Sequence, residues 1–195
     1  MYLYGASGHA KVIIDIIKSM GAPIDDIFDD NDAVKTLCGI EVNHKWSGQS
    51  PIIISIGDNR IRKLISERLG CEFDKAVHSS AVISPSVSIG DGTVVMAGAI
   101  INAESNIGKH CIINTGASID HECAIGDFVH IAPHSTLCGN VHVGEGSWVG
   151  AGATVIPGIK IGKWCTIGAG AVVIKDVPDY AVVAGVPAKI IKYKQ

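Results

Sequence analysis

One histidine in this 195-residue chain is flanked by a carboxylate on each side, in the run Asp120-His121-Glu122. Histidine is the usual general base near neutral pH, because its imidazole exchanges a proton in that range. A carboxylate bonded to one ring nitrogen would fix the tautomer and raise the basicity of the other nitrogen. Such a pair can take the proton from an amine or hydroxyl as it attacks a carbonyl carbon. Spacing alone leaves open whether Asp120 or Glu122 is the partner of His121. The alternative to a catalytic role is a solvated surface residue, which is the more common role of an outward histidine.

A second polar group is expected near the N-terminus, where three loops follow three apolar runs. The loops are Gly5–His9, Asp29–Asn31 and Gly57–Asn59. If the runs are parallel strands, these loops meet at the edge of the sheet where ligands bind in such folds. Backbone N–H groups at a helix N-terminus suit a phosphate, and a carboxylate suits ribose hydroxyls or a uracil N–H. The spacing G-x-x-G, with Ser7 inside it, argues against a full dinucleotide site. A plain tight turn is the alternative.

Two sequence patterns must position these groups, and the first covers residues 1–75. Strands are predicted at 1–4, 25–28 and 52–56, and helices at 10–20 and 61–69. Residues 35–48 are poorly patterned and are expected to form loops with one short strand. Strands that alternate with helices predict a small parallel sheet, so this part is interpreted as a Rossmann-like α/β domain.

The second pattern has a period of six and runs over residues 76–177. This period fits neither a helix nor a simple strand, and it is typical of the parallel β-helices built from hexapeptide repeats. Three repeats, or 18 residues, would form one triangular coil, so the 102 residues predict between five and six coils. The aliphatic residue of each repeat is Val77, Ile83, Ile89, Val95, Ile101, Ile107, Ile113, Ile119, Ile125, Ile131, Leu137, Val143, Val149, Val155, Ile161, Ile167 or Val173.

The repeat, the segment Gly-Ala-Gly-Ala-Thr-Val-Ile-Pro-Gly at 150–158 and the tail Ala-Gly-Val-Pro-Ala-Lys at 184–189 resemble the hexapeptide acyltransferases. Those enzymes have a left-handed parallel β-helix and are usually trimers. With the N-terminal pattern included, the whole chain resembles the bacterial sugar acetyltransferases of the PglD/NeuD type. The resemblance implies a nucleotide-sugar-binding domain at 1–75 and a left-handed β-helix acyltransferase domain with its tail at 76–195. It also implies acetyl-CoA as the acetyl donor and no metal.

On the donor side, the resemblance implies that His121 is the base, that Glu122 supports it and that His130 contacts acetyl-CoA. Because His130 follows His121 by nine residues, half a coil, the two should lie on different faces of one chain. They could meet only if a neighbouring protomer supplies one of them, which fits the homotrimer with active sites between protomers that the resemblance implies. Backbone groups are expected near the acetyl carbonyl at Gly139, and along the pantetheine arm at Ala151 and Ala169.

On the acceptor side, the resemblance implies direct N-acetylation of a nucleotide-linked amino sugar, with UDP as the expected nucleotide. Asn114 is a candidate for positioning the acceptor. The residues expected to bind the nucleotide sugar are Ser7, Gly8, His9, Asp29, Asp30, Gly57 and Asn59.

Several alternatives stay open. The acceptor could be the hydroxyl of a sialic acid, or an amino sugar linked to GDP or dTDP. Hexapeptide solenoids also serve as scaffolds or as carbonic anhydrases, which need three zinc-binding histidines. A metal site built from His130, His134 and His142 is disfavoured, because ligands must converge and spacings of four and eight do not match a period of six.

Composition excludes other classes of protein. The net charge is −3 and Lys and Arg do not cluster, which argues against a nucleic-acid partner. No apolar run approaches the ~20 residues of a membrane span, and no leader is recognisable, so a cytoplasmic protein is expected. The cysteines at the small position of the repeat are expected to be buried and unreactive: Cys111, Cys123 and Cys165. Three further histidines are expected at the surface: His110, His134 and His142.

Overall fold

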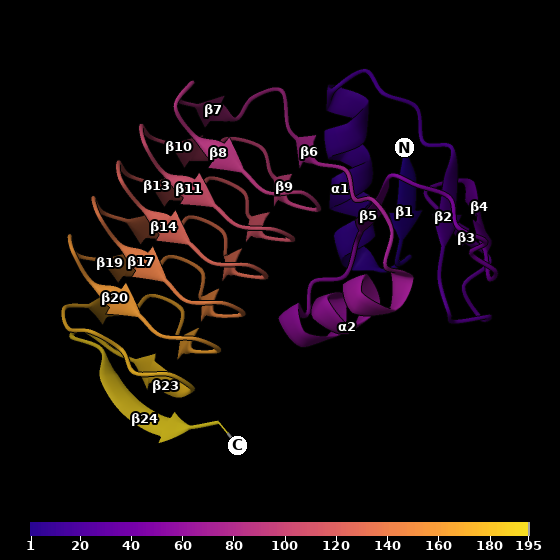
Figure 1. Cartoon of the computed structure of the whole chain (residues 1–195). Helices are drawn as coiled ribbons and strands as arrows, with labels where there is room; N and C mark the ends of the chain where they lie inside the picture. The colour runs from indigo at the N-terminus through magenta and orange to yellow at the C-terminus, as the bar shows by residue number, and fades with distance from the viewer. Residues whose placement is uncertain (195) are drawn as a thin grey trace.

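The computed structural model describes residues 1–194 and shows a small α/β domain docked on one side of a three-sided β-solenoid (Figure 1). The domain has a five-stranded sheet of order β3-β4-β2-β1-β5, parallel except for the β3–β4 pair. Strand β1 lies between β2 and β5, so the loops after these three strands surround one crevice. The elements are β1 (Tyr2–Tyr4), α1 (Gly8–Ser19), β2 (Asp26–Phe28), β3 (Thr36–Leu37), β4 (Ile40–Asn43), β5 (Ile52–Ile54) and α2 (Asn59–Leu69).

The domain differs from the sequence-based expectation in its details. Residues 35–48 form two antiparallel strands, β3 and β4, where one short strand was predicted. The reason is a two-residue turn in which both Cys38 (φ 51°) and Gly39 (φ 80°) are left-handed, the conformation that hairpin turns require. Neither of the two helices found in residues 1–194 is long and apolar enough to cross a membrane.

The solenoid consists of two-residue strands that pair in parallel with strands 18 residues away, as Ile101 pairs with Ile119. The sheet that meets the N-terminal domain is called the docking face, and the other two are called the uncharged face and the polar face. The docking face holds β6 (Ala76–Val77), β9 (Val94–Val95), β12 (Ile112–Ile113), β15 (His130–Ile131), β18 (Trp148–Val149) and β21 (Thr166–Ile167). The uncharged face holds β7 (Val82–Ile83), β10 (Ile100–Ile101), β13 (Ser118–Ile119), β16 (Thr136–Leu137), β19 (Thr154–Val155) and β22 (Val172–Val173). The polar face holds β8 (Ser88–Ile89), β11 (Asn106–Ile107), β14 (Ala124–Ile125), β17 (His142–Val143) and β20 (Lys160–Ile161).

The predicted fold class, a Rossmann-like domain followed by a left-handed parallel β-helix of hexapeptide repeats, is confirmed. The aliphatic residue of each repeat lies in the bore, and nearly all of them are buried. The last coil is extended by an antiparallel pair, β23 (Ala181–Ala184) and β24 (Lys189–Tyr193), which continues the docking-face sheet beyond β21.

Polar groups in the bore are paired in a repeating way. The small residue of a repeat donates a hydrogen bond to a carbonyl of the coil: Ser105 Oγ to Asp120 O at 2.8 Å, and Cys111 Sγ to Gly126 O at 3.1 Å. Cys111 thus takes the place of a serine. Burial raises the pKa of its thiol to about 12, so it is no nucleophile near neutral pH. This agrees with the structural role that the sequence predicted for it.

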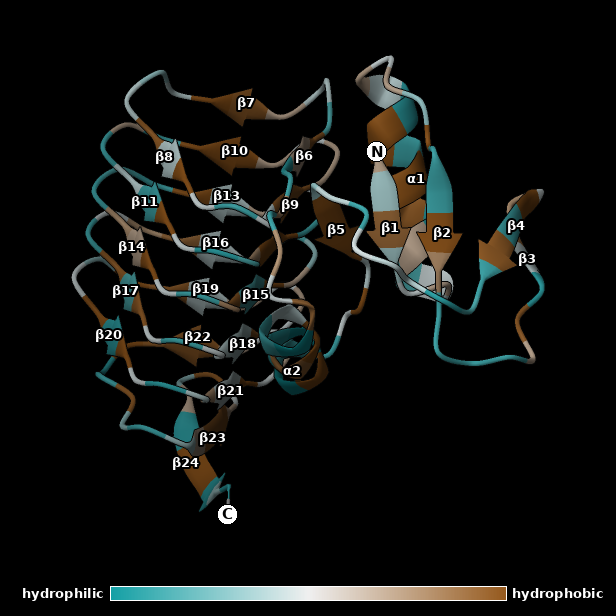
Figure 2. Ribbon diagram, turned by 45° about the vertical axis from the view of Figure 1, so that its right-hand side comes forward, coloured by the Kyte–Doolittle hydropathy of each residue, from teal (hydrophilic) through white to brown (hydrophobic). Residues whose placement is uncertain are grey.

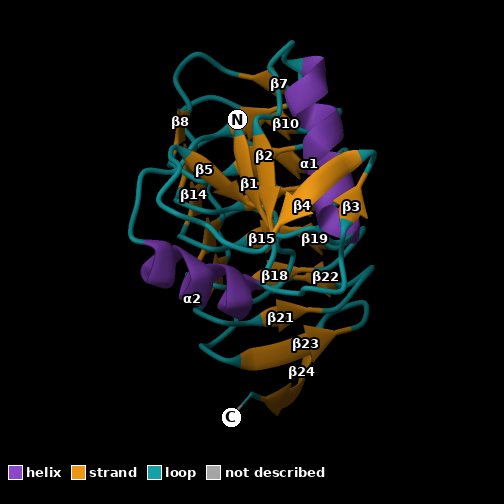
Figure 3. Cartoon of the chain, turned by 90° about the vertical axis from the view of Figure 1, so that its right-hand side faces the viewer, coloured by secondary structure: helices purple, strands orange, loops and turns teal. Residues whose placement is uncertain are grey.

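The domain contacts the docking face in two main regions. Buried isoleucines of α1, part of which is brown in Figure 2, share one apolar cluster with the outward residues of the first coils, Ala76, Val94 and Ile112. Farther along, α2 is attached by Arg62, which is only 1% exposed. Viewed from the domain side, α1 lies beside the early coils and α2 beside later ones (Figure 3). The edge of the small sheet at which β1, β2 and β5 end is therefore held against the solenoid.

Candidate active site

His121 lies at the corner between the uncharged face and the polar face. Its side chain is 57% exposed, and Nδ1 lies 2.9 Å from Glu122 Oε2. Glu122 has φ 60°, and this left-handed backbone turns its side chain toward the preceding residue. Asp120 instead accepts from the His121 backbone N–H at 2.8 Å and from Asn102 Nδ2 at 3.0 Å. Of the two carboxylates left open by the sequence, Glu122 is the one bonded to the ring, which leaves Nε2 for an outside proton.

The imidazole of His121 packs on the backbone of Gly139, one coil farther on. A methyl group on the Gly139 Cα would lie 2.6 Å from Cε1 and 2.7 Å from Nε2 of His121. Distances this short are not tolerated, so the missing side chain is what allows the ring its position. Gly139 therefore lies beside His121 Nε2, and its place near the acetyl group stays a prediction.

Replacing Gly139 with alanine is expected to displace the His121 ring and lower kcat about tenfold or more, because small errors in the position of a base are costly. Gly139 is not among the residues with positive φ, so alanine adds no backbone strain. The double variant Gly139→Ala/His121→Ala is the control. It should be no slower than His121→Ala alone, since the glycine acts through the ring. Additive losses in steady-state kinetics would contradict this.

A second cluster lies on the docking face around His130. Asn114 Nδ2 lies 3.0 Å from His130 Nε2, and Asn114 Oδ1 accepts from the Thr115 N–H at 2.8 Å. The amide therefore donates to Nε2, and Nδ1 carries the proton of a neutral ring. Burial, followed by the charges of Arg62 and His9, lowers the pKa of His130 to about 3, while a hydrogen bond with the Gly57 backbone opposes the shift. His130 is thus an uncharged group near pH 7.

His9 joins this cluster from the first loop of the N-terminal domain. Burial, and next the charge of Arg62, lowers its pKa to about 4. Its Nε2 is buried without a hydrogen-bond partner among residues 1–194. A methyl group on Gly57 would lie 4.0 Å from the His9 ring. The first and third loops of the sheet edge therefore meet at His9 and Gly57, directly beside His130.

The start of α1 is open to solvent. Ser7 and Gly8 are exposed, and the Ser7 side chain makes no capping hydrogen bond. No atom lies within 4 Å of a methyl group built on Gly8. The first N–H groups of the helix are therefore accessible to an anion such as a phosphate.

The two aspartates after β2 are both bonded within the protein. Asp29 accepts from the Ala6 N–H at 2.6 Å and the Asn31 N–H at 2.8 Å, so it joins the first two loops. Asp30 is bonded to the Tyr4 hydroxyl, and to Arg68 Nη2 at 2.9 Å. These contacts fix the carboxylates at the crevice, and a bound ribose or base would have to use their remaining lone pairs.

Asn59 holds the domain to the solenoid: its Nδ2 donates to Gly146 O at 3.1 Å, and its Oδ1 accepts from Arg62 Nη2 at 2.8 Å.

Sequence reasoning missed Arg62 altogether, because nothing marks it as different from the other charged residues of α2. It also placed His110 wrongly. The ring of His110 is buried, not at the surface, because it stacks on Phe128 at 5.0 Å and meets the edge of Phe73 at 4.5 Å.

The predicted site residues thus fall into groups at different corners of the prism. His121, Glu122 and Gly139 lie at the corner between the uncharged and polar faces. Ala151 and Ala169 are exposed at the corner between the docking and uncharged faces, where the Gly170 N–H donates to Ala151 O at 2.9 Å. Within one chain, the structure does not bring these two corners together. No group of three possible metal ligands occurs in the described part of the chain.

Comparison with known proteins agrees with both parts of the fold. Residues 1–69 match the PglD N-terminal domain, 79–103 the hexapeptide repeat of succinyl-transferase, and 140–175 the bacterial transferase hexapeptide. Among curated proteins, UDP-N-acetylbacillosamine N-acetyltransferase of Bacillus subtilis is 43% identical over 117 residues, covering 49% of this chain and 50% of that protein. The chain spans no more than half the length of the first curated relatives it matches.

Solved structures match over nearly the whole chain. A mutant perosamine N-acetyltransferase of Caulobacter crescentus, in complex with CoA and GDP-perosamine, is 42% identical with a TM-score of 0.94, over 98% of this chain and 96% of that one. The acetyltransferase domain of PglB from Neisseria gonorrhoeae is 37% identical with a TM-score of 0.91, over 97% and 98% of the two chains. The chain therefore belongs to the family of hexapeptide-repeat sugar acetyltransferases of the PglD type.

Proposed function

We propose that this protein transfers the acetyl group of acetyl-CoA to the amine of a nucleotide-linked amino sugar. The observation that carries the proposal is the exposed His121 with Nδ1 held by Glu122 and Nε2 available. The amine nitrogen attacks the thioester carbonyl and Nε2 takes its proton. The C–S bond then breaks, and the imidazolium gives the proton to the sulfur, so that CoA leaves as a thiol and His121 is neutral again. Glu122 stabilises the imidazolium that forms, as the acidic member of a triad does.

The shape of the solenoid supports a trimer with shared sites. The outward residues of the uncharged face include no charged side chain, and Val82 and Ile100 are exposed there in the single chain. Three copies that turn this face to a common threefold axis would meet along its two edges. One edge carries His121 and the other carries Asn114, Ala151 and Ala169. The base of one protomer would then adjoin the donor corner of the next.

The acceptor would be held by the N-terminal domain. The open start of α1 suits its diphosphate, and the crevice at Asp29 and Asp30 suits its nucleoside. The sugar would extend past His9 and Gly57 toward Asn114 and His130, where the His121 of a neighbouring protomer arrives. UDP remains the first candidate, as in the name of the Bacillus relative. GDP is the second, because the Caulobacter relative is in complex with GDP-perosamine.

A panel of acceptors tests the function. UDP-, GDP- and dTDP-linked amino sugars are incubated with acetyl-CoA and the wild-type protein, and the free thiol of CoA is followed. One amino sugar should release thiol, and its nucleotide alone should raise the melting temperature, because a ligand of the folded state stabilises it. Sialic acid serves as the O-acetylation arm. Binding of CoA without thiol release from any acceptor would contradict the proposal.

A further inference from the structure

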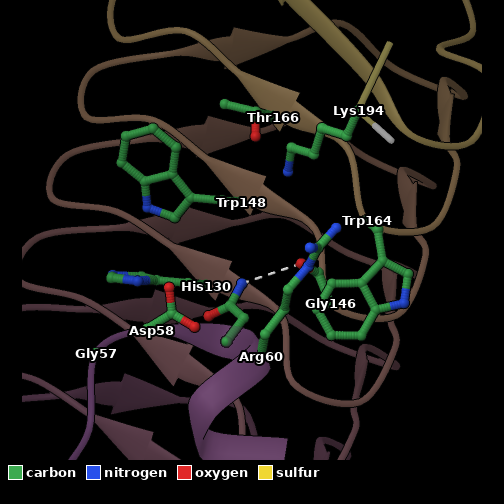
Figure 4. Close-up of a pocket in the computed structure, with 10 residues that line it drawn as sticks. Gly57, Asp58, Arg60, His130, Gly146, Trp148, Trp164, Thr166 and Lys194 are labelled. Carbon is green, nitrogen blue, oxygen red and sulfur yellow. Dashed lines mark hydrogen bonds between the residues drawn. The ribbon is translucent and has the colours of Figure 1, made fainter.

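A pocket of about 450 Å³ lies between the start of α2 and the docking face, beside the His130 cluster (Figure 4). It begins at Gly57 and His130 and continues along the coils of Trp148 and Thr166. Figure 4 shows Arg60 entering from α2 and Lys194 from the C-terminal segment, both with their charged ends toward the pocket. Two cations thus reach one cavity, one from the N-terminal domain and one from the segment after β24.

The positive charge in this pocket exceeds the negative charge, since Arg60 and Lys194 line it together with the single carboxylate of Asp58. The ion pairs formed by the neighbouring residues of α2 are Lys63 with Glu145 at 2.5 Å and Arg68 with Asp30 at 2.9 Å. Among residues 1–194, no carboxylate lies within ion-pair distance of Arg60 or Lys194. The single carboxylate of Asp58 can balance only one of these two cations, and an excess positive charge in a cavity favours an anionic ligand.

The other charged groups of the pocket also favour an anionic ligand. Asp58 is the one acidic residue lining it, and its Oδ1 accepts from the Ile61 N–H at 2.9 Å as the N-cap of α2. Burial, and next the charge of Arg60, lowers the pKa of Lys194. A bound anion would relieve that repulsion between the two cations. Arg60 is already oriented, since its Cζ lies 5.7 Å from the centre of the Trp164 ring.

Trp164 is itself positioned by a glycine. A methyl group on Gly146 would lie 2.4 Å from the indole, so the ring rests directly on this backbone. Trp148 forms the opposite wall and is 36% exposed. The pocket therefore has flat aromatic sides and cationic ends, a surface that suits a phosphorylated nucleotide more than a small inorganic anion.

We propose that Arg60 and Lys194 bind the phosphate groups of coenzyme A. The inference rests on the proposed function and adds to it the anchor of the donor. Trp148 and Thr166 belong to the same two repeats as Ala151 and Ala169, the residues expected along the pantetheine arm. Successive coils are about 4.8 Å apart, so an arm that starts at the acetyl site and follows these coils moves toward Lys194. The acceptor's diphosphate belongs instead at the start of α1, on the far side of His9.

The test compares donors that differ only in their phosphates. Binding of acetyl-CoA, acetyl-dephospho-CoA and S-acetylpantetheine is measured by calorimetry for the wild type, Arg60→Gln and Lys194→Gln. Each variant should bind acetyl-CoA about tenfold more weakly or worse, the usual effect of losing one charge-assisted hydrogen bond. Its affinity for S-acetylpantetheine should equal that of the wild type. Acetyl-dephospho-CoA, which lacks the 3′-phosphate, shows which cation contacts that group. The variant that has lost this cation should bind acetyl-CoA and acetyl-dephospho-CoA with similar affinity, whereas the other variant should still prefer acetyl-CoA.

Lys192→Gln is the matched control, since Lys192 is an exposed lysine two residues from Lys194 and outside the pocket. It should bind acetyl-CoA as the wild type does. The proposal is overturned if both pocket variants keep wild-type affinity for acetyl-CoA, or if their affinity for S-acetylpantetheine falls as much as their affinity for acetyl-CoA. These measurements need no acceptor, so a failure to find an acetylated sugar would sink the proposed function alone. A wild type that does not bind acetyl-CoA would sink both.

Discussion

Replacing His121 with alanine is expected to lower kcat about 10²- to 10⁴-fold, the usual range for loss of a general base. The side chain is exposed and makes its one side-chain hydrogen bond with Glu122, so its removal should leave the fold intact. Affinity for acetyl-CoA should change little, because the pocket that holds Arg60 and Lys194 lies beside a different face of the prism. Steady-state kinetics with saturating acetyl-CoA, and calorimetry of CoA binding, measure the two effects separately.

Two further variants make this test specific. Glu122→Gln keeps the shape of the side chain but removes the charge that stabilises an imidazolium, so it should lose part of the rate that His121→Ala loses. His142→Ala is the control, because His142 is also an exposed histidine but its ring is bonded to the amide oxygen of Asn140 at 3.2 Å and not to a carboxylate. It should keep wild-type kcat. A wild-type kcat in His121→Ala would exclude this residue as the base.

The period of six was sufficient to predict which residues line the bore and which lie at corners. Every coil repeats the same backbone path, so the position of a residue in its hexad sets its direction, as for Ile101, Ile119 and Leu137 in the uncharged-face sheet. The separation of His121 from His130 follows from the same regularity. Such reasoning works because each coil contacts only its neighbours.

The partner of His121 was not predictable in this way. Adjacent side chains usually point apart, and they converge here because Glu122 adopts φ 60°. Glutamate is not a residue that favours this conformation, so nothing in its type signals it. Buried His110 was misplaced for a related reason, since it also has positive φ and lies under Phe73 and Phe128, which come from outside its own repeat.

Contacts between the two parts of the chain could not be predicted from the sequence either. The apolar spacing of α1 indicates that one face is buried, but it does not say against what. The hydrophobic cluster that includes Ile13 and Ala76, and the docking of α2 by Arg62, depend on how the parts meet in space. Periodicity describes each part separately, whereas the pocket near His130 exists only because the two are joined.

Replacing Arg62 with methionine is expected to destabilise the protein by about 3 kcal/mol or more, because it leaves several buried carbonyls without their donors. The guanidinium donates from Nε to His110 O at 2.8 Å and from Nη2 to Phe128 O at 3.1 Å, both on the solenoid. Nη1 donates to Ile56 O at 3.0 Å and to Gly57 O at 3.2 Å, both on the loop after β5. Burial lowers the pKa of Arg62 to about 10, so the group still carries its charge at pH 7.

Urea unfolding at pH 7 measures the loss, with Lys63→Met as the matched control from the next position of α2. Lys63 pairs with Glu145 at the surface, and such a pair is worth about 1 kcal/mol or less. The two variants remove one cation each from the same helix, so they separate the role of burial from the role of charge. In Arg62→Met, the loss of docking should also let the α/β domain unfold before the solenoid. The urea curve of the variant should then show two unfolding transitions, whereas that of the wild type shows one. Equal urea midpoints for the two variants would show that Arg62 does not hold the loop after β5 against the solenoid, and the pocket beside His130 would then need another anchor.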